Sequence, residues 1–178
     1  GILTFTDSGV VTAGYVADQL GLPMPGPYES IQILQNKGLF RKFLAEHGFN
    51  VPKAKSYFSA EQAWGERDEW QYPVIVKPVD SAGSKGVTKV DSEDQLIAAI
   101  HFALEFSISD EFIIEAWIEK DGCSSDSDCF SLNGEFQILT YSSQRFDSAA
   151  PNPYAPAAFS WPSTMGEKVE NELSFELQ

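Results

Sequence analysis

Basic residues are scarce in this sequence of 178 residues. It has 12 lysines and arginines against 26 aspartates and glutamates, which gives a formal net charge of −14 at pH 7. Nucleic acids and anionic membrane surfaces are bound mainly through clusters of basic side chains. The charge therefore argues against both kinds of partner.

Cysteines and long apolar runs are also scarce. Cys123 and Cys129 have neither the spacing of zinc ligands nor the density of a secreted disulfide scaffold, so we expect free thiols in a cytoplasmic protein. The longest uninterrupted apolar run is only a few residues, which excludes a transmembrane helix, and no signal peptide is visible. Apolar residues nevertheless make up 43% of the chain, which is ample for a packed core in one domain or two small ones.

The most informative stretch runs from Tyr72 to Val90, with the sequence YPVIVKPVDSAGSKGVTKV. Residues 74–76 are β-branched without polar alternation, which predicts a strand buried on both faces. Lys77 ends this strand, and because an unpaired buried ammonium is costly, we expect anionic or watery surroundings there. Residues 81–86, SAGSKG, form a small-residue loop whose backbone N–H groups and hydroxyls can approach a ligand, as a phosphate cradle requires. A second strand over residues 87–90 would make this loop a hairpin lid.

Taken alone, this stretch has a second interpretation. A Gly/Ser hairpin with Lys77 reaching solvent from a strand end would look the same. The loop matches neither G-x-x-x-x-G-K-[ST] nor G-x-G-x-x-G, which excludes two familiar phosphate-binding motifs. In so acidic a chain, a polyphosphate would have to be held by a local group of lysines and a divalent metal.

The remaining elements form a regular order. Residues 54–118 are predicted as strand, helix, strand, loop, strand, helix, strand, an α+β unit with helices covering one face of a mainly antiparallel sheet. Capping boxes at Ser59 and Ser92 begin its two helices. A helix after Asn36 carries Lys37 and Arg41 one turn apart, a pair that by itself indicates a solvated basic face. Other predicted elements are a strand over 1–6, a helix ending near 20 that is capped by Asp7 or Ser8, a short helix over 29–35, a hairpin turn at Asn133-Gly134, a return strand over 136–141, a proline-rich loop over 148–156 and a helical segment after 167.

Several of these motifs together resemble the ATP-grasp ligase family, in particular the ATP-binding half of carbamoyl-phosphate synthase large-chain-like proteins. The resemblance covers most of the chain and rests on the order of Asn36-Lys37-x-x-Phe40-Arg41, Val51-Pro52, Val74-Ile75-Val76-Lys77-Pro78, the loop to Gly86-Val87 and Ile113-Ile114-Glu115. It implies that residues 1–50 end a preceding α/β domain, that residues 51–117 form a small lid lobe and that residues 118–178 begin a large catalytic lobe. Because the first strand has no predicted partner before it, we expect a piece of a longer protein.

The resemblance also implies roles for individual residues. Lys77 and Lys37 resemble the two lysines that bind the ATP phosphates, and the loop residues Ser81, Gly83, Ser84, Lys85 and Gly86 resemble the mobile loop that closes over them. Glu115, Ala116 and Ile118 resemble the segment that hydrogen-bonds adenine, with Ala116 and Ile118 acting through their backbones. Apolar walls around the base would come from Ile75, Val87 and Trp117. The acid that holds the ribose is not settled between Asp121 and Asp128.

The function implied by the resemblance is an ATP-dependent carboxylate–amine ligase, or a related C–N forming ligase, that acts through an acyl phosphate. Its ligands would be ATP or ADP, Mg²⁺ and a small-molecule carboxylate. The family's metal ligands are expected beyond residue 178, so we expect this chain to bind nucleotide but to be inactive alone. A noncatalytic nucleotide-binding or scaffold module is the alternative, and an α+β domain whose lysines only increase solubility is a third. The oligomeric state cannot be predicted from this sequence.

Overall fold

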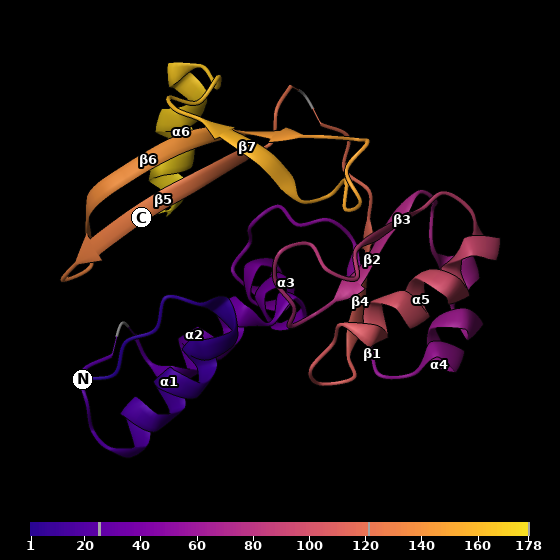
Figure 1. Cartoon of the computed structure of the whole chain (residues 1–178), viewed down its shortest axis with the longest axis horizontal. Coiled ribbons are helices and arrows are strands. Elements are labelled where there is room, and N and C mark those ends of the chain that lie inside the picture. The colour runs from indigo at the N-terminus through magenta and orange to yellow at the C-terminus, as the bar shows by residue number, and fades with distance from the viewer. Residues whose placement is uncertain (25, 121, 178) are drawn as a thin grey trace. The chain divides into compact units, whose positions relative to one another are not determined.

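The computed structural model describes residues 1–24, 26–120 and 122–177, which form two compact units. The first unit comprises Gly1–Ile118 and the second Glu119–Gln178 (Figure 1). Among the described residues, no helix has both the length and the apolar character needed to cross a bilayer. Cys123 and Cys129 are free thiols, as the sequence predicts.

Three helices open the first unit. They are α1 (Asp7–Gln19), α2 (Tyr28–Gln35) and α3 (Lys37–Glu46). The strand predicted over residues 1–6 is wrong: residues 1–5 have no regular secondary structure, and Thr6 is the N-cap of α1 in place of Asp7 or Ser8. An apolar segment becomes a strand only where another strand pairs with its backbone, and the four strands of this unit pair with one another.

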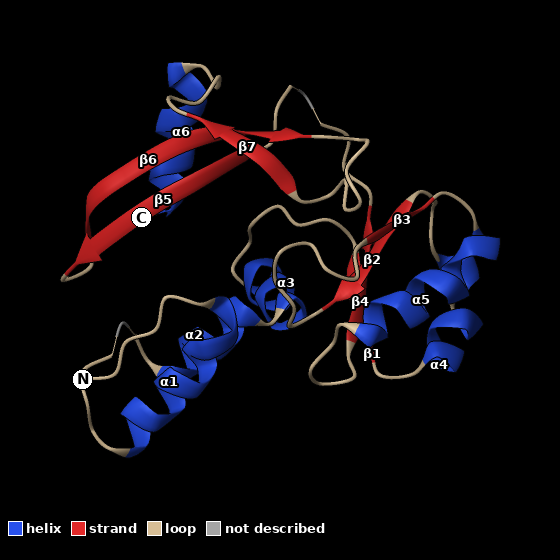
Figure 2. Cartoon of the chain, viewed as in Figure 1, coloured by secondary structure: helices blue, strands red, loops and turns tan. Residues whose placement is uncertain are grey.

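The sheet of the first unit has the order β1-β4-β2-β3 and is antiparallel throughout. Its strands are β1 (Ala54–Tyr57), β2 (Val74–Pro78), β3 (Thr88–Val90) and β4 (Phe112–Ala116). Between them lie α4 (Ala60–Gly65), the 3₁₀ turns η1 (Arg67–Glu69) and η2 (Glu93–Gln95), and α5 (Leu96–Glu105). Figure 2 shows α4 and α5 beside this sheet. The predicted α+β order is therefore confirmed.

The helices α4 and α5 cover one face of this sheet (Figure 2). Val74 and Val76 of β2 are fully buried in a core with the α4 and α5 side chains, whereas Ile75 and Lys77 are half-buried. The prediction that β2 is buried on both faces is therefore wrong, because both covering helices pack on the same side. The second face holds the fully buried Ile113 beside the charged side chains of Lys77 and Glu115.

The helix starts show which local signals act as predicted. Ser59 caps α4 by accepting a hydrogen bond from the backbone N–H of Gln62 at 3.2 Å. Ser92 does not cap its helix: its hydroxyl donates to Asp94, and the Gln95 side chain accepts from the backbone N–H of Asp91. A 3₁₀ turn therefore precedes α5.

The second unit is a three-stranded antiparallel sheet with one helix. Its elements are β5 (Ser125–Leu132), β6 (Glu135–Phe146), β7 (Pro156–Ser160) and α6 (Glu167–Leu177), with strand order β5-β6-β7. Asn133 and Gly134 both have positive φ, 54° and 83°, which confirms the predicted hairpin turn. The Tyr141 hydroxyl lies 2.8 Å from the Ser174 hydroxyl on α6 and ties the helix to β6.

Candidate functional site

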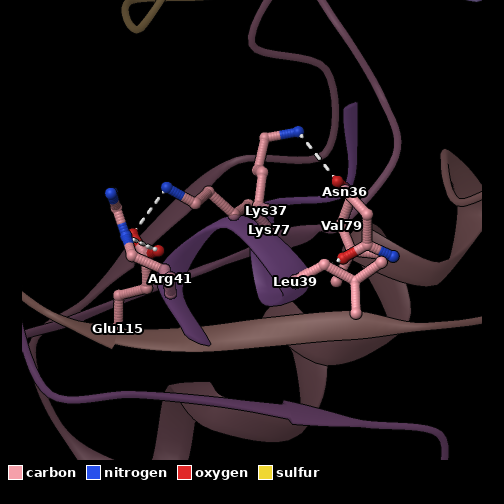
Figure 3. Close-up of polar contacts among 7 residues, drawn as sticks. All are labelled: Asn36, Lys37, Leu39, Arg41, Lys77, Val79 and Glu115. Atoms are coloured by element: carbon pink, nitrogen blue, oxygen red, sulfur yellow. Dashed lines mark hydrogen bonds and ion pairs between the residues drawn. The ribbon is translucent and has the colours of Figure 1, made fainter. Parts of the chain in front are cut away.

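Four charged side chains gather on the face of the first sheet opposite α4 and α5. Lys77 comes from β2 and Glu115 from β4, and both lie on the face that α4 and α5 leave uncovered. Lys37 and Arg41 come from the first two turns of α3. Figure 3 shows Arg41 and Lys77 converging on the Glu115 carboxylate, with the Lys37 side chain turned toward the carbonyl of Val79.

The centre of this cluster is Glu115, which is only 5% exposed. Arg41 Nε lies 2.8 Å from Glu115 Oε1, and Lys77 Nζ lies 2.6 Å from Glu115 Oε2. Burial by itself raises the pKa of Glu115, but Lys77 and Arg41 outweigh it and the net pKa is lowered. The carboxylate is therefore ionised at neutral pH, with one cation on each oxygen.

Lys37 is held close to the loop that follows β2. Its backbone N–H donates to the Val79 carbonyl at 2.9 Å, and its ammonium donates to the Ser81 carbonyl at 2.7 Å. Burial and the nearby positive charge of Lys77 lower the pKa of Lys37, although Asp80, Glu115 and Asp7 oppose the shift. Lys37 starts its helix because the Asn36 side chain caps it, accepting from the N–H of Leu39 at 3.0 Å.

The cluster has an excess of positive charge in a strongly acidic chain. Lys37, Arg41 and Lys77 bring three cations, and Glu115 is the carboxylate that two of them share. The ammonium of Lys37 contacts carbonyl oxygens, which carry only partial charge. Such a group is suited to bind an anion with several negative charges.

The small-residue loop beside Lys37 contains three residues with positive φ, a backbone conformation that favours glycine. Gly83, Ser84 and Gly86 have positive φ of 67°, 56° and 70°. A Cβ on Gly86 would lie 3.0 Å from Pro78 Cδ, whereas one on Gly83 would meet nothing within 4 Å. The root of the loop is fixed, because the Asp80 carboxylate accepts from the backbone N–H groups of residues 108 and 109 at 3.0 and 2.8 Å.

The segment predicted to contact a base lies at the end of β4. The N–H of Ala116 donates to the Lys53 carbonyl at 2.8 Å, and the N–H of Trp117 donates to the Pro73 carbonyl at 3.2 Å. Ala116 could therefore offer a ligand only its carbonyl. Ile118 is 63% exposed, just beyond the strand that was predicted to include it. Ile75 and Val87, the predicted walls, are half-buried.

The predicted site residues are not all brought together by the structure. Lys37, Ile75, Lys77, the loop residues and the segment ending at Ile118 all belong to the first unit. Asp128 is an exposed residue of β5 in the second unit, where it pairs with Thr140 on β6. Asp121 lies outside the described residues. Their roles, like those of the other predicted site residues, stay predictions.

Arg41 is the functional candidate that sequence reasoning missed. Its spacing of four residues from Lys37 places both on one side of α3, and this spacing was interpreted as a solvated basic face. Arg41 is instead 29% exposed and bonded to a buried acid 74 residues away. A glutamate in an otherwise apolar strand was the available signal, because a buried carboxylate requires cationic partners.

Metal ligands are a separate question. Among residues 1–24, 26–120 and 122–177, no three or more His, Cys, Asp or Glu side chains are arranged so that they could hold a metal ion. The donors present in the described cluster are mainly cations and amides, which suit an anion and not Mg²⁺.

Comparison with known proteins yields a family match and similar structures. The family described as ATP-grasp domain matches residues 34–174. The D-alanine–D-alanine ligase of Natranaerobius thermophilus is 28% identical over 146 residues, covering 74% of this chain and 39% of that protein. The carbamoyl phosphate synthase large chain of Paenarthrobacter aurescens is 29% identical over 169 residues, covering 93% of this chain and 15% of that protein.

Among solved structures, the VanG D-Ala:D-Ser ligase of Enterococcus faecalis shares the fold, with a TM-score of 0.78 at 22% identity. The match covers 96% of this chain and 51% of that one. The chain thus spans about half or less of the lengths of these similar proteins.

Proposed function

Because this chain belongs to the ATP-grasp family of ATP-dependent ligases, we propose that it supplies the ATP-binding part of a carboxylate–amine ligase or a related C–N forming ligase. The observation that carries this proposal is the cluster of Lys37, Arg41 and Lys77 around Glu115, beside a loop rich in glycine and serine. In a chain with a net charge of −14, three cations gathered around one carboxylate are suited to an anionic ligand.

The proposed reaction has two steps. An oxygen of the substrate carboxylate attacks the γ-phosphorus of ATP, the bond to the β,γ-bridging oxygen breaks, and an acyl phosphate and ADP form. The amine nitrogen then attacks the acyl carbon, phosphate leaves with the C–O bond electrons, and the nitrogen gives up a proton. Catalysis of such a transfer depends on positioning and on neutralising the charge of the phosphoryl group.

We assign the phosphate contacts to this chain's lysines and loop. Lys77 and Lys37 would bind the phosphates, and Lys37 would at the same time fix the start of the loop through Ser81. Backbone N–H groups of residues 81–86 and the exposed Lys85 would add to the neutralisation. The base would lie against Ile75, Val87 and Trp117 and hydrogen-bond to the 115–118 segment.

The lobe boundaries belong to the same proposal. Residues 1–50 would end a preceding α/β domain, residues 51–117 would form the lid lobe and residues 118–178 would begin the large lobe. Mg²⁺ would screen the phosphates when bound, but the described residues offer no set of ligands for it, so no step of the proposal depends on it. A noncatalytic nucleotide-binding module is the second candidate, favoured by the same absence of a carboxylate cluster among the described residues.

A titration with ATP and with ADP, each with and without Mg²⁺, tests the proposal by calorimetry. A charge-assisted hydrogen bond contributes about 1.5 to 3 kcal/mol, so Lys77→Ala is expected to weaken ATP binding about tenfold or more. Lys42→Ala is the matched control, because Lys42 lies on α3 with its side chain 71% exposed and only a 3.9 Å pair to Glu46. Equal ATP affinity of the wild-type and Lys77→Ala proteins would contradict the role of Lys77.

A further inference from the structure

The single ammonium group of Lys77 is assigned two contacts, one with Glu115 and one with a phosphate. In the structure it lies 2.6 Å from Glu115 Oε2 and is only 18% exposed. Under the proposed function, on which this inference rests, the same ammonium binds a phosphate. A lysine that turns from a carboxylate to a phosphate leaves the carboxylate behind in a buried position, and an uncompensated buried charge is strongly unfavourable.

Arg41 occupies the other oxygen of the same carboxylate. Its Nε contacts Oε1 at 2.8 Å, so the Arg41 contact does not depend on where the Lys77 ammonium lies. A guanidinium stays protonated at every physiological pH, presents several donors and suits a partly buried ion pair. It can therefore hold Glu115 as a carboxylate after Lys77 has moved.

We infer that Arg41 is a positioning residue that compensates Glu115 while Lys77 binds the phosphates of a nucleotide. Without Arg41, Lys77 would be the single cation bonded to Glu115 and would remain on it. The phosphate contact of Lys77 would then compete with the Lys77–Glu115 ion pair, because breaking this pair would leave a buried carboxylate unpaired. Arg41 thus affects phosphate binding without touching the nucleotide.

A purely structural role for Arg41 makes a different prediction. Arg41 also joins α3 to β4, and its removal could weaken this packing whatever the charge at residue 115. The two roles differ in their dependence on the carboxylate: compensation is needed only when Glu115 is charged. A double-mutant cycle between Arg41 and Glu115 separates them.

The experiment measures ATP and tripolyphosphate binding by calorimetry for the wild-type protein, R41M, E115Q and R41M/E115Q. Tripolyphosphate lacks the base and sugar, so it reports the phosphate contacts alone. We expect R41M to weaken binding of both ligands about tenfold or more in the wild-type background, but less than about threefold in the E115Q background. The conservative R41K variant should restore binding to within about threefold of wild type, and K42M should leave it unchanged.

Each outcome has one meaning. Equal weakening by R41M in both backgrounds, or no weakening in either, would overturn the role of Arg41 while the proposed function stands. Failure of the wild-type protein to bind ATP or tripolyphosphate would overturn the proposed function and this inference together. Thermal unfolding without ligand identifies a variant that does not fold, and in that case R41Q replaces R41M in the cycle.

Discussion

The two sheets of this protein bury their side chains to very different extents. In the first unit, Phe112 and Ile114 of β4 are fully buried beneath α4 and α5, and the opposite face carries the ion-paired Lys77 and Glu115. In the second unit, the buried sheet residues among those described are Tyr141, Ser142 and Ser143. Its large apolar side chains are more exposed, as in Phe130 (56%), Leu132 (56%), Ile138 (57%) and Phe159 (42%).

This difference shows what each sheet can do by itself. The first sheet has a complete apolar core on one face and can therefore hold a buried charge cluster on the other without losing its fold. The second sheet has little core within its own unit, and its packing relies on polar contacts such as Tyr141 to Ser174. Exposed apolar sheet residues of this kind mark surfaces available for contact.

Truncating one phenylalanine in each sheet should give the largest difference in unfolding free energy between the two units. Phe112→Ala removes a fully buried ring that stacks on Tyr57 at a centroid distance of 5.6 Å, and should cost about 3 to 5 kcal/mol of unfolding free energy. Phe130→Ala removes a ring that is 56% exposed and should cost less than about 1 kcal/mol. Urea titration followed by circular dichroism measures both. Similar losses for the two variants would mean that the sheets do not differ in core burial.

Acidification should reduce the stability that the charged face of the first sheet contributes through Glu115. The folded state lowers the pKa of Glu115, so its contribution to stability is complete above the unfolded pKa of about 4.3 and is lost as the pH falls through the lower folded pKa. Glu115→Gln should be less stable than wild type at pH 7, and the gap should narrow on acidification by about 1.4 kcal/mol for each unit of pKa shift.

The unfolding free energy is measured between about pH 3 and pH 7, in steps of about half a pH unit. Glu46→Gln is the control, because the Glu46 side chain is 60% exposed and pairs only at 3.9 Å with Lys42. A gap between wild type and Glu115→Gln that stays constant with pH would contradict the ionised, cation-paired state of Glu115.

The smallest expected effect concerns the helices that cover the first sheet. Ser59→Ala removes a hydroxyl that caps α4 and should cost about 1 kcal/mol. Ser92→Ala removes a hydroxyl that bonds to Asp94 and caps no helix, so it should cost less than about 0.5 kcal/mol. Thermal unfolding of the two variants compares them, and equal shifts would show that the Ser59 cap does not stabilise α4.

Much of the fold was predictable from local sequence patterns. The order of strands and helices from residue 54 to 116 followed from apolar runs and turn residues, and the Asn133-Gly134 turn followed from its dihedral requirements. Local patterns failed where a partner decides the structure. Residues 1–5 lack a strand to pair with. No strand was predicted directly after the proline-rich loop over 148–156, although Phe159 and Ser160 of β7 pair with β6.

The sequence indicated residues of the charged cluster, such as Lys77, better than it indicated the contacts between them. The position of Lys77 at the end of an apolar run indicated anionic or watery surroundings, and in the structure the Glu115 carboxylate lies beside it. That Arg41 shares this carboxylate could not be inferred from helical spacing, since it depends on how α3 packs against β4. Long-range ion pairs of this kind are set by tertiary packing.

The loop after β2 has a practical consequence for anyone who redesigns it. Gly86 is buried with a positive φ of 70°, and a Cβ there would lie 3.0 to 3.2 Å from Pro78 and Phe106, so substitutions at this position are expected to be strained. The tip at Ala82 and Lys85 is exposed. Because Lys85 belongs to the proposed phosphate contacts, random diversification or attachment of a fluorescent label is best confined to Ala82.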